Sequence, residues 1–109
     1  MELKYLNDSF AVTGQISVAD VGKLAADGFT TVVCNRPDGE EPGQPTSAAI
    51  AEACQQAGLA FQFIPMNGPN YSAADVSNLK RAVSASDGKV LGFCRTGNRS
   101  SILWNAAQA

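Results

Sequence analysis

The chain has 109 residues, of which 45% are apolar and 17% are charged, and its formal net charge is −2. This length and apolar content predict a single domain over residues 1–109 with one core. The small net charge gives no basic stripe for a nucleic-acid backbone, and no segment approaches the roughly 20 apolar residues of a membrane span. Because the first residues also lack an apolar stretch of signal-peptide length, we expect a cytoplasmic protein that binds neither nucleic acid nor membrane.

The first half of the chain alternates β-branched runs with Ala-rich segments of helical period, which is typical of βα units around a mostly parallel sheet. Ser17 and Asp20 form a capping box at the start of one predicted helix, and Gly58 ends the next in a left-handed conformation. The predicted order is strand, helix, strand, long loop and helix, over residues 10–12, 17–28, 29–34, 35–45 and 46–58.

The second half of the chain repeats this alternation. It predicts strands over residues 59–66 and 89–93, a helix from residue 72 between them, and a final helix over residues 101–108. The whole pattern predicts a single three-layer α/β domain, with a mostly parallel sheet of about four to five strands and helices on both faces. Ligands of such sheets bind at the carboxyl ends of the strands, here near residues 35, 67 and 94.

The chain contains three cysteines, Cys34, Cys54 and Cys94, and no histidine. Their odd number and their spacing predict neither a disulfide scaffold nor a metal site, and we expect no cofactor. Cys34 and Cys54 lie on expected core positions. Because no imidazole base is present, a catalytic cysteine must be activated by other groups.

The segment that follows the last predicted strand carries the candidate chemistry. Gly97 lets its backbone curl, so that successive N–H groups and the next helix can surround an anion. Amide donors and arginines favour the thiolate of a cysteine at the first position. We predict two catalytic residues, Cys94 and Arg99, and six substrate-binding residues, Arg95, Thr96, Gly97, Asn98, Ser100 and Arg36. For Arg36, an ion pair with a carboxylate of its own loop is an equal alternative.

The segment from Cys94 to Ser100 resembles the active loop of single-domain rhodaneses, with cysteine first, glycine fourth, arginine sixth and serine seventh. Tyrosine and dual-specificity phosphatases carry a similar loop, but with five residues between cysteine and arginine where this chain has four. The resemblance implies that the shorter loop suits a persulfide. We therefore expect a sulfurtransferase, in which Cys94 takes sulfane sulfur from thiosulfate or glutathione persulfide and passes it to a thiol or cyanide acceptor.

Three segments further resemble the bacterial family of β-lactamase-hydrolase-like proteins, namely residues 12–15, 35–45 and 93–104. This resemblance covers nearly the whole chain. It implies a dual-specificity-phosphatase-like fold and an activity described in that family either as phosphatase or as sulfur transfer. It also implies a partner, a metallo-β-lactamase-like persulfide dioxygenase.

Two alternatives remain open. The first is a phosphatase with a phosphocysteine intermediate on Cys94, which requires a proton donor for the leaving oxygen. The loop over residues 67–71 contains no carboxylate, Asp75 is explained by helix capping, and Phe93 stands where those phosphatases usually have histidine, which leaves Asp38 as the remaining candidate acid. The second alternative is a non-catalytic module that holds an anion or carries sulfur.

Overall fold

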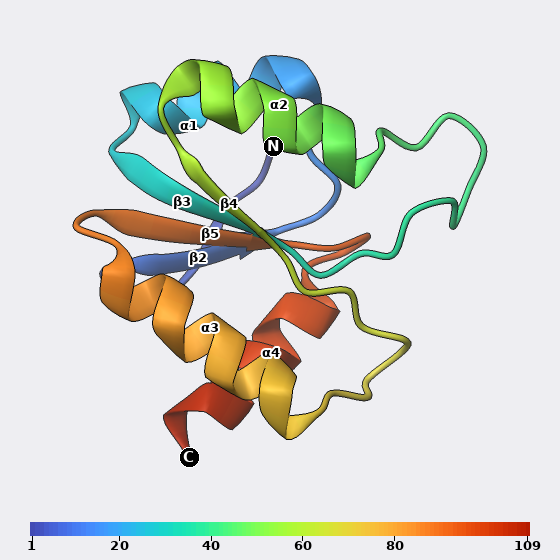
Figure 1. Cartoon of the computed structure of the whole chain (residues 1–109), viewed down its shortest axis with the longest axis vertical. Coiled ribbons are helices and arrows are strands. Elements are labelled where there is room, and N and C mark those ends of the chain that lie inside the picture. The colour runs from blue at the N-terminus through green and yellow to red at the C-terminus, as the bar shows by residue number, and fades with distance from the viewer.

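Five strands form one sheet in the order β1-β2-β5-β3-β4 in the computed structural model, which describes residues 1–109 (Figure 1). β1 is antiparallel to β2, and the other neighbours are parallel. The predicted α/β class and mostly parallel sheet are confirmed. The strands are β1 (Lys4–Asn7), β2 (Phe10–Thr13), β3 (Phe29–Cys34), β4 (Ala60–Phe63) and β5 (Lys89–Phe93).

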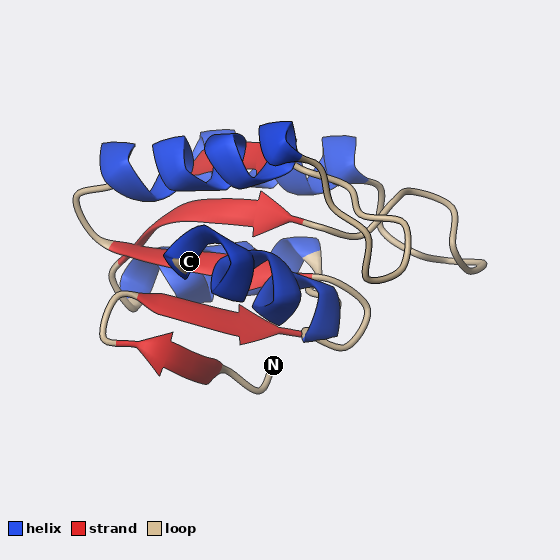
Figure 2. Cartoon of the chain, turned by 90° about the horizontal axis from the view of Figure 1, so that it is seen from below, coloured by secondary structure: helices blue, strands red, loops and turns tan.

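Helices cover both faces of this sheet, as predicted. One pair packs on each face, as Figures 1 and 2 show. The first pair is α1 (Val18–Ala26) and α2 (Ser47–Ala57), and the second pair is α3 (Ala73–Ala85) and α4 (Asn98–Gln108). None of these helices has the length and apolar character that a bilayer span requires.

Local signals account for three of the helix boundaries. The predicted capping boxes are present at Ser17 and at Ser72, where each backbone N–H binds the aspartate three residues later. Gly58 ends α2 with φ 79°, in the left-handed region that favours glycine. These contacts confirm the predicted starts of α1 and α3 and the predicted end of α2.

One strand and two boundaries differ from the prediction. β1 was not expected, because its residues are mostly exposed and lack the alternating pattern of a half-buried strand. The strand predicted over residues 59–66 ends at Phe63; beyond it, the Ile64 N–H donates to the carbonyl of Cys34, the last residue of β3, and the Met66 N–H donates to the carbonyl of Asn35. α4 begins at Asn98 rather than at residue 101, because Gly97 adopts φ +94° and the helix starts directly after it.

The sheet divides the core into two apolar clusters, one beneath each helix pair. β5 lies between β2 and β3 at the centre of the sheet, and its side chains contribute to both clusters. The parallel strands β2, β5, β3 and β4 all end at the same edge. The loops that follow them therefore meet there, at the right of Figure 1.

Candidate active site

Cys94 directly follows β5 and is only 1% exposed. The next residues curl around its sulfur, and the Gly97 N–H donates to Cys94 Sγ at 3.0 Å. The loop after β2 supports this curl from behind, since a Cβ on Gly14 would lie 2.8 Å from the carbonyl oxygen of Arg95. Two glycines thus give the loop its shape, one by its positive φ and one by allowing a close approach.

The environment of Cys94 favours the thiolate. Burial by itself raises the pKa of the thiol, but the backbone N–H groups of Ser100, Thr96, Arg99 and Gly97 outweigh burial and lower the pKa below its ordinary value. Arg99 and Ser100 belong to the first turn of α4, whose amino end carries partial positive charge. The first turn of the helix thus supplies two of the amides that stabilise the sulfur anion.

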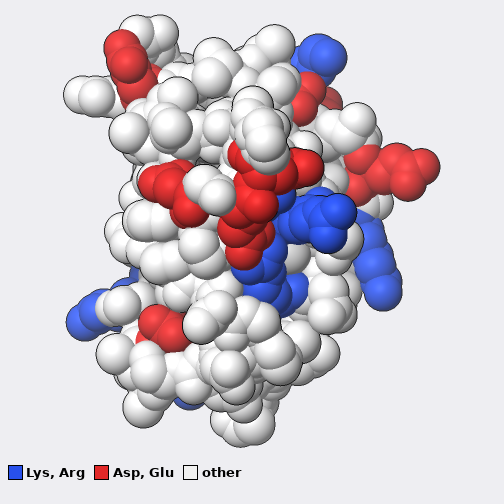
Figure 3. Space-filling model, turned by 90° about the vertical axis from the view of Figure 1, so that its right-hand side faces the viewer, with Lys and Arg blue, Asp and Glu red and all other residues white.

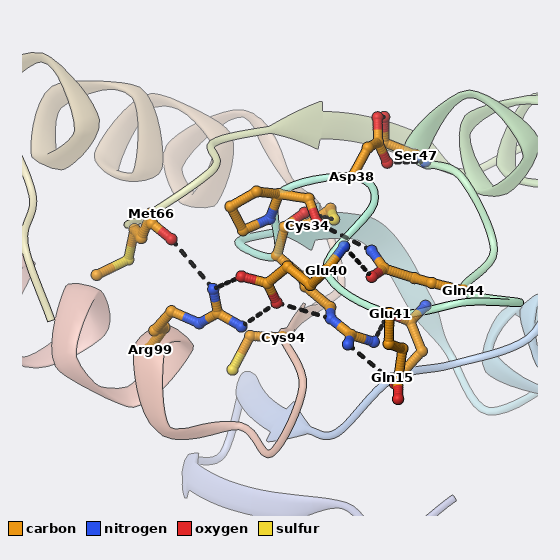
Figure 4. Close-up of polar contacts among 12 residues, drawn as sticks. Gln15, Cys34, Asp38, Glu40, Glu41, Gln44, Ser47, Met66, Cys94 and Arg99 are labelled. Carbon is orange, nitrogen blue, oxygen red and sulfur yellow. Dashed lines mark hydrogen bonds and ion pairs between the residues drawn. The ribbon is translucent and has the colours of Figure 1, made fainter. Parts of the chain in front are cut away.

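Arg99 is held by the loop that follows β3 (Figure 4). Its Nη1 and Nη2 each donate to the Glu40 carboxylate at 2.8 Å, and Nη1 also donates to the Met66 carbonyl at 3.1 Å. Glu40 and, secondarily, the Cys94 thiolate raise the pKa of Arg99. The Nε–H and the second Nη2–H lie on one edge of the planar guanidinium and remain available to two oxygens of an anion.

Glu40 was not predicted as a site residue, although it connects the two arginines of the site. Its Oε1 accepts from Arg36 Nε at 2.9 Å as well as from Arg99 Nη2. The hydrogen bonds from Arg99, opposed by burial and assisted by Arg36, lower the pKa of Glu40 to about 2. The only sequence signal was its place in a loop predicted to border the crevice, which does not distinguish it from its acidic neighbours.

Arg36 adopts the ion-paired alternative. Its side chain is 1% exposed, and three nitrogens donate, Nε to Glu40, Nη2 to Glu41 at 2.9 Å and Nη1 to Gln15 at 3.1 Å. This guanidinium orders the long loop and orients Glu40. Arg36 also lines a cavity of about 480 Å³ beside the reactive loop, together with Glu40, Glu41, Arg95 and Arg99.

The remaining predicted residues occupy different positions. Arg95 is exposed on the wall of this cavity and makes no ion pair. Thr96 and Asn98 instead border a larger cavity of about 940 Å³ on the side of the N-terminus, away from the arginines. The Ser100 hydroxyl is buried and donates to Asn35 Oδ1 at 2.8 Å, so its role is to anchor the helix.

Asn35, another residue that was not predicted, joins the loops after three strands. Its backbone N–H donates to the Phe93 carbonyl at 2.8 Å, and its Nδ2 donates to the Ile64 carbonyl at 2.8 Å. Its side-chain oxygen receives the Ser100 hydroxyl. Asn35 therefore ties the end of β5, the segment after β4 and the first turn of α4 together, next to the residue that precedes the reactive cysteine.

The candidate acid and the other thiols are engaged elsewhere. Asp38 accepts from the backbone N–H and the hydroxyl of Ser47, at 2.7 and 2.8 Å, and thus stabilises the start of α2. Burial raises the pKa of Cys34 to about 12 and that of Cys54 to about 11. Cys94 is thus the one cysteine whose surroundings favour ionisation.

Comparison with known proteins identifies the family. The family model of the β-lactamase hydrolase-like protein, phosphatase-like domain, matches residues 2–109. The chain belongs to this family.

It is 34% identical over 109 residues to the β-lactamase hydrolase-like protein of Agrobacterium fabrum, covering 100% of the chain and 25% of that relative. A relative of the same name from Xylella fastidiosa is 35% identical over 104 residues, which are 95% of the chain and 24% of the relative. The chain thus spans about a quarter of the length of these curated relatives.

Several solved structures with a similar fold are described as phosphatases. A presumed phosphatase from Neisseria meningitidis matches with a TM-score of 0.83 and 34% identity, covering 97% of the chain and 75% of that structure. Tk-PTP in its active form has a TM-score of 0.71 and 17% identity, covering 97% and 80%. The core catalytic domain of the PP-IP phosphatase SIW14 from Saccharomyces cerevisiae has a TM-score of 0.66 and 11% identity, covering 97% and 64%. The last two show likeness of fold alone.

These comparisons contradict the expectation of sulfur transfer. The family is phosphatase-like, and the Neisseria structure at 34% identity is described as a phosphatase, which supports a hydrolase and the alternative that the sequence left open. The length of the loop was not a sound basis for predicting that Cys94 carries a sulfur atom rather than a phosphoryl group. A count of residues between Cys94 and Arg99 does not include the amides that the first turn of α4 adds to the anion cradle.

Proposed function

We propose that this domain is a cysteine-dependent phosphatase, a hydrolase in which Cys94 accepts the phosphoryl group. The observation that carries the proposal is the buried Cys94 sulfur at the start of α4, to which the Gly97 N–H donates at 3.0 Å and whose pKa the neighbouring backbone N–H groups lower. A thiolate in such surroundings is a nucleophile that needs no histidine base. Membership of a phosphatase-like family supports the same chemistry.

Arg99 supplies the second requirement, a fixed donor for the transferred group. Glu40 and the Met66 carbonyl hold one side of its guanidinium, and the Nε edge stays available. Two parallel N–H groups suit two oxygens of a phosphoryl group, and loop amides suit the third. We infer that Arg99 binds the phosphoryl group in the transition state and that Glu40 is a positioning residue.

The reaction proceeds in two steps. The Cys94 thiolate attacks phosphorus, an S–P bond forms, and the bond from phosphorus to the leaving oxygen breaks. Water then attacks the phosphocysteine, the S–P bond breaks, and phosphate leaves with the protons of the water while the thiolate is regenerated. Loop amides and Arg99 stabilise the negative charge on the phosphoryl oxygens in both steps.

Hydrolysis of p-nitrophenyl phosphate by the purified chain tests this function. Cys94→Ser should abolish phosphate release, while Cys54→Ala, at a buried cysteine away from the site, should retain it. Arg99→Lys keeps the charge but loses the planar fork, and should reduce kcat on the order of 10²–10³-fold. Intact mass after acid quenching should show one added phosphoryl group on the wild type only.

Either of two outcomes would overturn the proposal. If phosphate release is absent, or if it persists unchanged in Cys94→Ser, then Cys94 does not carry a phosphoryl group. Retained binding of inorganic phosphate without turnover would then identify an anion-binding module, the non-catalytic alternative.

A further inference from the structure

The carboxylates around the reactive loop are engaged as hydrogen-bond acceptors of arginines or of a helix start, rather than poised to give a proton to a leaving group. Both oxygens of Glu40 accept hydrogen bonds from guanidinium groups, and one oxygen of Glu41 accepts from Arg36. Asp38 is bound to the amino end of α2, and the loop over residues 67–71 has no carboxylate. A leaving group at this site must therefore depart as a stable anion.

The cavity beside Cys94 also lacks an apolar wall. All five lining residues are charged, and Figure 3 shows acidic and basic side chains adjoining on this face. A site for an aromatic leaving group is expected to present apolar or aromatic side chains to the ring. None of the large exposed hydrophobics of the chain, Phe63 and Tyr71 included, lines this cavity. The surroundings thus do not select an aryl phosphate.

Arg95 adds a cation that nothing in the chain neutralises. It immediately follows Cys94, lies exposed on the cavity wall and has no ion pair, whereas Arg36 and Arg99 are both held by Glu40. A guanidinium in this position suits a second anionic group next to the transferred phosphoryl group.

We propose that the substrate of this site is a phosphoanhydride, whose terminal phosphoryl group reacts with Cys94 and whose leaving phosphate is bound by Arg95. This inference rests on the proposed function. A phosphoanhydride meets all three conditions, since its leaving group is a phosphate that is stable as an anion, carries no aromatic ring and brings its own negative charge.

The proposed step balances without a proton donor. The Cys94 sulfur forms a bond to the terminal phosphorus, the bridging P–O bond breaks, and its electron pair remains on the departing phosphate. Water then attacks the phosphocysteine, the S–P bond breaks, and phosphate leaves. No reactant other than water is needed. An alkyl phosphate would instead release a strongly basic alkoxide, which the site does not protonate.

The experiment compares leaving groups at one site, in the presence of EDTA to suppress metal-dependent contaminants. Tripolyphosphate is the anhydride, glycerol 2-phosphate the alkyl ester and O-phosphotyrosine the aryl ester, with p-nitrophenyl phosphate as the reference for activity. A general acid typically supplies about 10²–10⁴-fold in rate. Because the site lacks one, we expect kcat/KM for tripolyphosphate to exceed that for glycerol 2-phosphate by a factor in this range or larger.

Arg95→Ala tests the second half of the inference. It should raise KM for tripolyphosphate about tenfold more than KM for p-nitrophenyl phosphate, because only the former places charge on the leaving side. Arg81→Ala is the matched control, since Arg81 is an exposed arginine of α3 that contacts Asn78 and lies outside the cavity. It should leave both constants unchanged.

The outcomes separate this inference from the proposed function. Failure to cleave any of the four compounds in a Cys94-dependent manner overturns the phosphatase itself. If p-nitrophenyl phosphate is cleaved but kcat/KM for glycerol 2-phosphate or O-phosphotyrosine equals that for tripolyphosphate, only the phosphoanhydride proposal is overturned. The same holds if Arg95→Ala raises the KM values for tripolyphosphate and p-nitrophenyl phosphate equally. A weak dependence on leaving-group pKa that becomes steep in Glu41→Gln would identify Glu41 as an acid and would also overturn it.

Discussion

Replacing Glu40 with glutamine should destabilise the domain at neutral pH, because the carboxylate holds both Arg36 and Arg99. The pKa of Glu40 falls from 4.5 to about 2 on folding. At about 1.4 kcal/mol per pKa unit, the full linkage is about 3 kcal/mol. The side chain is 32% exposed. Solvent screening therefore reduces the expected loss to about 1–2 kcal/mol, or roughly 5–10 °C in Tm.

The pH dependence of this loss gives the sharper test. A depressed carboxyl pKa contributes stability that is fully present above the unfolded value of 4.5 and is lost as pH falls toward about 2. Urea unfolding of wild type and Glu40→Gln should therefore give curves that converge as the buffer is taken from neutral pH to about pH 3. Glu52→Gln, an exposed position on α2, should match wild type throughout. An unchanged stability at neutral pH, or a difference that is constant with pH, would refute the reasoning.

Three further predictions concern the reactive loop. Alkylation of native protein by iodoacetamide should modify Cys94 alone, with a midpoint below the ordinary pKa of a thiol, and mass spectrometry locates the adduct. Gly97→Ala should lower the free energy of unfolding by about 1–2 kcal/mol and abolish most phosphatase activity, because Gly97 has φ +94° and its N–H contacts the Cys94 sulfur. Gly39→Ala, at φ +76° with no neighbouring atom in the way, should lower stability without changing activity. Ser100→Ala leaves the Asn35 oxygen without its donor and should lower the free energy of unfolding by about 1–3 kcal/mol in chemical denaturation.

Local sequence signals predicted the parts of the fold that depend on neighbouring residues. The capping boxes at Ser17 and Ser72 require only residues three apart, and the Cys94 loop is a continuous segment between a strand and a helix. The unexpected strand β1 had no such signal, because an exposed edge strand does not need alternating hydrophobicity.

Contacts between distant segments account for what the sequence did not reveal. The Glu40–Arg99 pair spans 59 positions, and the loop around Glu40 offers two other carboxylates, Asp38 and Glu41. The role of Asn35 likewise depends on three strands ending side by side. Cytoplasmic location and a metallo-β-lactamase-like partner stay predictions.

The junction at Asn35 has a consequence for how this domain can diversify. Its hydrogen bonds fix the end of β5, the segment after β4 and the first turn of α4 relative to one another. The outer residues of a loop that is anchored in this way do not have to shape the nucleophile. Residues 67–71, which take no part in the hydrogen bonds of Arg36, Glu40 and Arg99, can then be exchanged to recognise new leaving groups while the thiolate keeps its reactivity. Swapping this segment between relatives would transfer selectivity without changing the nucleophile.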